Sequence, residues 1–355
     1  MDSNKNRIIW LDTLKGFATI CVVLGHVVDG YMGAGFFPAH TQILRSLYNG
    51  TYTFHMALFF AISGMAYRLA YFWSDPHGSV VLKRDKLRKQ MLNLLLIYIL
   101  YCLVMGAFKI IVATYVNKAV SPIDLLLIWG KPIYPYWYLY VLIIYYFCFS
   151  FMLRRDWIQK RRIFFVVVLA AISCLSGFCN MHGWFQIQNV MKYALFFYIG
   201  IRTAEDKSLN WGISLLLTAC ALAVVILYWN DQKYICNVPV ISTVAPLGIV
   251  LFLIKLGSNS SICNRQGILS FLGKHSLEIY VLHCFFTAGN RLFLPKLGIA
   301  DFWTSMAVNL VSSIAIPVIV SMVSKKMGIY NLFFAPIRLI HRNNKNQPDN
   351  TSTQA

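Results

Sequence analysis

Long apolar runs separated by short polar connections make up most of the chain. A helix needs about 20 mostly apolar residues to cross a bilayer, and this criterion predicts ten spans. They cover residues 8–29, 50–72, 91–116, 134–153, 163–180, 187–203, 211–229, 239–256, 267–287 and 303–324. We therefore predict an all-α, polytopic transmembrane helix bundle. The predicted membrane-embedded domain covers residues 1–330, and a cytoplasmic tail of residues 331–355 is predicted to end in disorder.

The composition supports a membrane protein. Of 355 residues, 58% are hydrophobic and 13% are charged, whereas about 25% are charged in a typical soluble protein. This composition excludes a soluble globule and a disordered chain. The nine cysteines form no C-x-x-C pair, so packing in the apolar core is favoured over disulfide or metal chemistry.

Positive residues alternate between the two sides of the predicted membrane. One set of connections, with both tails, holds 21 Lys and Arg residues, and the other set holds 6. Because positive residues stay in the cytoplasm, both termini are predicted to be cytoplasmic. The formal net charge of +19 then reflects topology. Nucleic acid is not an expected partner, because no basic stretch lies on a soluble domain large enough to fold.

Ionisable residues within the spans are candidates for function, because burying a charge in hydrocarbon is costly. The predicted directions of three different spans place His26, His55 and His283 at similar depth in the outer half of the membrane. Glu278 is expected nearer the middle, and Arg68 near the inner end of the second span. A single histidine is more often a hydrogen-bonded packing residue, and Arg68 equally fits a boundary residue.

The first span carries its polar residues on one face. Lys15 and His26 are eleven residues apart, which is three helical turns plus about 20° and about 16 Å along the axis. They are therefore placed to hold two ends of one long ligand, with an anionic part near the cytoplasm. Asp12 lies on nearly the same face and is positioned to orient Lys15.

Several segments resemble one family of membrane enzymes. The opening RIIWLDTLKGFA at 7–18, followed by VVLGH at 22–26, resembles the start of the acyltransferase 3 family. FHMALFFAISG at 54–64 and LGKHSLEIYVLH at 272–283 are similar to its second-helix and late-helix signatures. WYLY at 137–140 and FFYIG at 196–200 resemble weaker blocks. Lys15, where Arg is commoner, suggests the branch similar to fucose 4-O-acetylases.

The resemblance implies transfer of an acyl group, usually acetyl, from cytoplasmic acyl-coenzyme A to a hydroxyl of an extracytoplasmic glycan or its lipid-linked precursor. The basic-x10-His motif of the family falls on Lys15 and His26, and its basic motif after the second helix falls on Arg84 and Arg88. A proline often follows that second motif, whereas Asn93 and Leu94 stand near its place here. The implied location is the lipid bilayer of a bacterial cytoplasmic membrane.

These patterns assign a role to each candidate residue. Histidine titrates near neutral pH, so His26 is the expected general base or acyl carrier. The full assignment is catalytic for His26, Glu278 and His283, donor-binding for Lys15, Arg84 and Arg88, substrate-binding for His55, Trp137 and Tyr138, and structural for Asp12 and Arg68. No metal is expected, because the histidine spacing forms no metal motif.

Two other functions stay open from the sequence. A transporter or flippase of lipid-linked sugar would also have many spans and buried charges, although no second half of the chain resembles the first. A sensor or scaffold would require that His26 be dispensable. The acceptor sugar, the choice between acetyl and succinyl, and the oligomeric state do not follow from the sequence.

Overall fold

The computed structural model describes residues 8–74, 80–115, 117, 119–179, 183–205, 218–219 and 240–339. The longer helices are α1 Ile9–Gly33, α2 Thr41–Tyr71, α3 Arg84–Ile111, α5 Trp137–Met152, α7 Arg162–Leu175, α8 Ile187–Glu205, α10 Ile241–Asn259, α12 Ser276–Phe293 and α13 Phe302–Lys326. The short helices are η1 Pro38–His40, η2 Ala113–Tyr115, α4 Pro122–Leu126, α6 Asp156–Lys160, η3 Ser176–Phe178, η4 Trp184–Gln186, α11 Ile268–Lys274, η6 Pro295–Leu297 and α14 Tyr330–Phe334.

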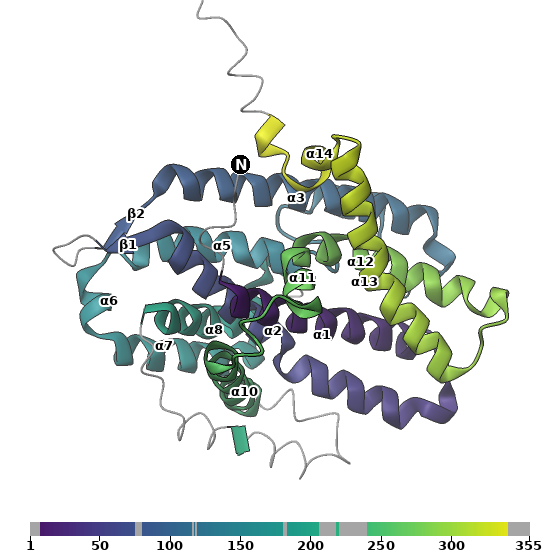
Figure 1. Ribbon diagram of the computed structural model, residues 1–355, viewed down its shortest axis with the longest axis horizontal. Helices are drawn as coiled ribbons and strands as arrows, with labels where there is room; N and C mark the ends of the chain where they lie inside the picture. Colours follow the sequence, from purple (N-terminus) through teal and green to yellow (C-terminus); the bar gives the residue numbers. More distant parts are fainter. Residues whose placement is uncertain are drawn as a thin grey trace, which may run out of the picture.

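The helical membrane fold is confirmed. A helix covers each predicted span except 211–229, which lies outside the described residues apart from 218–219. Four of the described helices, α1, α3, α10 and α13, are long and apolar enough to cross a membrane by length and composition. Figure 1 shows α1 in the middle of the bundle, α3 along one edge, and α13 crossing at an angle.

Three local features differ from the hydropathy pattern. The predicted span 267–287 is divided into α11 and α12 at His275, whose φ and ψ of −105° and 15° leave the helical region. Helix α2 begins at Thr41 instead of residue 50, because Leu44 in its polar first turns is buried against the bundle. Between α2 and α3, strands β1 Phe72–Ser74 and β2 Val80–Leu82 pair antiparallel, with Phe72 opposite Leu82.

Glycines allow two pairs of helices to pack with their backbones in close approach. A Cβ added at Gly16 on α1 would overlap the carbonyl oxygen of Leu269 on α11. A Cβ at Gly64 on α2 would likewise overlap Phe197 on α8, and one at Gly200 would overlap Ala61. Small residues are favoured at such crossings because helices in lipid associate through close packing.

The bundle extends beyond the predicted domain boundary at residue 330. Helix α14 begins at this residue and packs against α3 and α13. Phe334 is buried, and the backbone N–H of Ile337 donates to Asn93 Oδ1 at 3.4 Å. The last part of the predicted tail, residues 340–355, lies outside the described residues, and so does the end predicted to be disordered.

Candidate active site

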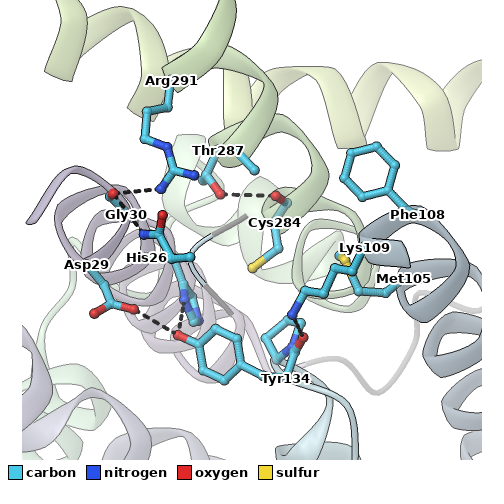
Figure 2. A pocket seen from close by; sticks show the side chains of 13 residues that line it. His26, Asp29, Gly30, Met105, Phe108, Lys109, Tyr134, Cys284, Thr287 and Arg291 are labelled. Atoms are coloured by element: carbon cyan, nitrogen blue, oxygen red, sulfur yellow. Dashed lines mark hydrogen bonds between the residues drawn. The ribbon is translucent and has the colours of Figure 1, made fainter. Parts of the chain in front are cut away.

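A cavity of about 100 Å³ lies among the C-terminal halves of α1, α3 and α12 and the segment that precedes α5 (Figure 2). It is lined by His26, Asp29, Gly30, Met105, Phe108, Lys109, Asn117, Tyr134, Pro135, Cys284, Thr287, Ala288 and Arg291. The predicted topology directs all three helices outward. The cavity is therefore expected in the outer half of the membrane.

His26 is held in this cavity by a tyrosine. The hydroxyl of Tyr134 lies 2.7 Å from His26 Nδ1 and donates to Asp29 Oδ2 at 3.4 Å. Either group can be the donor in the 2.7 Å contact. In the tautomer in which the Nδ1–H of His26 donates to the phenol oxygen, the phenol proton is directed to Asp29 and the lone pair of the imidazole is on Nε2.

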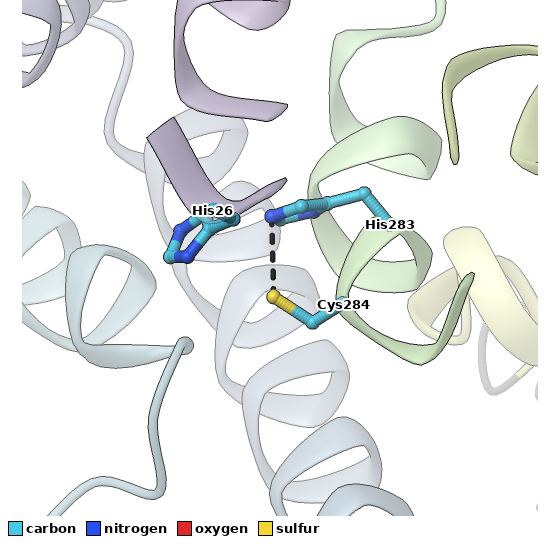
Figure 3. A group of neighbouring side chains, drawn as sticks. All are labelled: His26, His283 and Cys284. Atoms are coloured by element: carbon cyan, nitrogen blue, oxygen red, sulfur yellow. Dashed lines mark hydrogen bonds between the residues drawn. The ribbon is translucent and has the colours of Figure 1, made fainter. Parts of the chain in front are cut away.

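A second histidine and a cysteine lie beside His26 (Figure 3). The rings of His26 and His283 are 4.9 Å apart between centroids, and His283 is fully buried. Nδ1 of His283 lies 2.8 Å from the carbonyl oxygen of Tyr280 and 3.0 Å from that of Ile279. Both oxygens only accept, so Nδ1 carries the proton and Nε2, 3.3 Å from Cys284 Sγ, has the lone pair.

Two cations and one carboxylate set the charge of the cavity. Lys109 Nζ donates to the carbonyl oxygen of Tyr134 at 2.9 Å, and Arg291 Nη1 donates to that of Gly30 at 2.6 Å. Asp29 is the acidic residue among the lining side chains. The formal charge of the lining is therefore positive, which favours a reaction that develops negative charge.

The three predicted substrate-binding residues do not line this cavity. His55 Nδ1 lies 2.5 Å from the carbonyl oxygen of Thr51 within α2. Trp137 stacks on Tyr193 at 5.8 Å between ring centroids. Tyr138 is buried and shares a 2.6 Å hydrogen bond with the Ser63 hydroxyl. Their contacts are those of core residues, and sugar binding by them stays a prediction.

Glu278 faces a different side of α12 from His283. Five residues separate the two, which is about 140° around a helix. The buried carboxylate of Glu278 accepts hydrogen bonds from the hydroxyls of Tyr330 at 2.9 Å and Ser321 at 3.3 Å, and His275 Nδ1 lies 3.5 Å away. Glu278 thus joins α12 to α13 and α14, and its catalytic role stays a prediction.

The basic residues expected near the cytoplasm lie away from the cavity. Lys15 Nζ is 3.7 Å from Asp12 Oδ1 on the preceding turn. Arg68 Nε donates to Glu205 Oε1 at 2.6 Å, in an arrangement that suits a structural residue. Arg84 and Arg88 are exposed in the first turns of α3.

The site residues that the sequence pattern did not single out include Asp29 and Tyr134. Asp29 follows His26 by three residues, so helical spacing alone places both on one face. Tyr134 lies at the edge of the fourth predicted span, where hydropathy carries no sign of its contact with α1.

Residues 8–322 match the family model Acyl_transf_3, which describes an acyltransferase domain. No curated protein and no solved structure matches the chain significantly. The matched region contains every residue that lines the cavity. The chain therefore belongs to the acyltransferase 3 family and is a membrane acyltransferase.

Proposed function

We propose that this protein transfers an acyl group from cytoplasmic acyl-coenzyme A to a hydroxyl of an extracytoplasmic glycan or its lipid-linked precursor. The proposed acyl group is acetyl. The observation that carries the proposal is the cavity in which Tyr134 and Asp29 orient His26 beside Lys109 and Arg291. A positioned base with cations around it is the arrangement that acyl transfer to a hydroxyl requires.

His26 is the proposed general base. Its Nε2 takes the proton from the acceptor hydroxyl as the hydroxyl oxygen attacks the thioester carbonyl carbon. The C–S bond then breaks, an ester bond remains, and the proton passes from His26 to the sulfur of coenzyme A. Tyr134 and Asp29 are positioning residues in this scheme, because they set the tautomer of His26.

Lys109 is the proposed electrostatic stabiliser of the reaction. Attack on the thioester places negative charge on the carbonyl oxygen. Lys109 Nζ, which donates to the Tyr134 carbonyl oxygen, and the guanidinium of Arg291 place positive charge at the cavity. This positive charge would stabilise the developing oxyanion.

The donor is proposed to enter from the cytoplasmic end of the bundle. Lys15 lies about 16 Å from His26 along α1, which suits a ligand with an anionic end and a distant thioester. Arg84 and Arg88 are exposed and can receive further phosphate charge. From Arg88 to Met105 at the cavity, α3 spans about 26 Å, so these two arginines would bind the far end of the donor.

The test is turnover by the purified full-length protein in lipid nanodiscs, with acetyl-coenzyme A and a cell-surface glycan fraction. Release of coenzyme A and formation of the O-acetyl ester are measured together. His26→Gln should lower kcat by about 10²- to 10⁴-fold, the usual contribution of a general base.

His40→Gln is the matched control, because His40 stacks on Phe302 with 4.2 Å between ring centroids and does not line the cavity. Near-normal turnover by His26→Gln would make His26 a packing residue. Movement of lipid-linked sugar without release of coenzyme A would instead favour the flippase.

A further inference from the structure

We infer that His26, His283 and Cys284 form a binding site for a soft divalent transition metal ion, Zn²⁺ above all, and that the bound ion inhibits the enzyme. Only the inhibition depends on the proposed function. The sequence spacing gave no metal motif because the three residues come from two helices, α1 and α12, that meet only in the fold.

The ligand atoms are already close together. One ring nitrogen from each histidine and Cys284 Sγ all lie within 4.8 Å of one another. In a tetrahedral zinc site, with bonds of about 2.0 Å to nitrogen and about 2.3 Å to sulfur, neighbouring ligand atoms are about 3.3–3.6 Å apart. The 3.3 Å between His283 Nε2 and Cys284 Sγ fits this directly. The remaining separations need to close by no more than about 1.5 Å when an ion binds.

The hydrogen bonds around the cluster support metal binding. A metal-binding histidine usually donates its other N–H to a carbonyl, carboxylate or similar acceptor, which fixes the ring. Nδ1 of His283 is directed at two backbone carbonyls of α12, and Nδ1 of His26 at the Tyr134 hydroxyl. Both rings can therefore present Nε2 to one ion.

The ligand types select the metal. Imidazole and thiolate bind Zn²⁺ and related soft ions well, whereas Mg²⁺ and Ca²⁺ prefer oxygen. Three protein ligands leave a fourth position, which is expected to hold a water molecule because Cys284 and His26 line the cavity. Binding replaces the thiol proton of Cys284 by the metal ion and releases one proton to solvent.

The bound ion would stop acyl transfer. A lone pair on Nε2 that binds a metal no longer accepts the proton of the acceptor hydroxyl.

Binding is tested first, on the purified detergent-solubilised protein without substrates. Zn²⁺ is titrated in competition with a chromogenic chelator, and Co²⁺ is titrated while thiolate-to-metal charge-transfer absorption is recorded. The intact protein should bind one ion with this absorption. Cys284→Ser should remove the absorption and weaken binding at least about tenfold.

Cys102→Ser is the control, because Cys102 is buried on α3 outside the cluster. Lack of a bound equivalent, or equal binding by Cys284→Ser and the intact protein, would overturn the site.

Inhibition is tested next, by turnover with increasing Zn²⁺ and recovery with a chelator. The intact enzyme should be inhibited at concentrations at least about tenfold lower than Cys284→Ser. Tight Zn²⁺ binding with unchanged or increased turnover would refute the inhibitory role. An inactive protein that still binds the ion through Cys284 would instead count against the proposed function alone.

Discussion

Replacing Tyr134 by Phe removes the hydroxyl that joins His26 to Asp29 and leaves the ring in place. His26 Nδ1 then loses its partner at 2.7 Å, and Asp29 loses a donor at 3.4 Å. All three side chains are half-buried, and the net loss of such a hydrogen bond costs about 0.5–1.5 kcal/mol. At about 1.4 kcal/mol for each factor of ten, kcat should fall by about 2- to 12-fold.

The assay is coenzyme A release at saturating and limiting donor. The KM for acetyl-coenzyme A should change little, because Tyr134 lies on the His26 side of the cavity, away from Lys15. Tyr140→Phe is a matched control, since its hydroxyl donates to the carbonyl oxygen of Trp129 at 2.9 Å in an exposed position. A kcat for Tyr134→Phe within twofold of the control would refute the orienting role.

A double-mutant cycle separates orientation from general stability. If Asp29 acts through Tyr134, Asp29→Asn should lower kcat in the intact protein and have little further effect in Tyr134→Phe. Additive losses would mean that Asp29 acts on the reaction by another route.

Three further predictions concern the donor, the packing and the topology. In a binding titration, Lys15→Gln and Arg88→Gln should each weaken acyl-coenzyme A binding by about two- to fivefold, and more at low salt. Arg45→Gln, on the predicted outer side of the membrane, is the control, and an equal effect there would show a loss of general stability instead. Gly200→Ala should lower stability by about 1–3 kcal/mol, because its Cβ would overlap the Ala61 carbonyl, whereas Gly50→Ala meets no atom within 4 Å and should be neutral in thermal unfolding. Reporter fusions after residue 40 should be outside and those after residues 85 and 158 inside, and one reversed reporter would contradict the span assignment.

The sequence predicted helix positions well because the apolar runs that cross a bilayer are long and continuous. It was less exact where packing extends or divides a helix. The polar first turns of α2 are helical because Leu44 is buried, and α12 begins after a break at His275. Neither the burial of Leu44 nor the break at His275 changes the local hydropathy.

The predicted depth of His26 and His283 in the membrane was enough to place these two histidines in one site. It did not predict which other side chains lie beside them. Depth along a span follows from residue number, whereas rotation around the helix decides which side chains meet. His55 shares the predicted depth of the other two histidines, yet it contacts Thr51 and Tyr52 on its own helix. Tyr134 reaches His26 from a connection, and only the tertiary fold places it there.

The size of the cavity bears on which acyl group is transferred. A cavity volume of about 100 Å³ suits the few heavy atoms of an acetyl group. Met105 lines it with a side chain that is 2% exposed, so a longer acyl chain must displace packed atoms at a cost of about 1–3 kcal/mol.

Acetyl-coenzyme A should therefore exceed butyryl-coenzyme A in kcat/KM by about 5- to 150-fold. Met105→Ala should reduce that ratio at least about fivefold by opening the wall, whereas Met65→Ala, at a buried methionine on α2 away from the cavity, should preserve it. The ratio, unlike the rate, is insensitive to the fraction of folded enzyme. An identical ratio in both variants would mean that the acyl group is bound elsewhere.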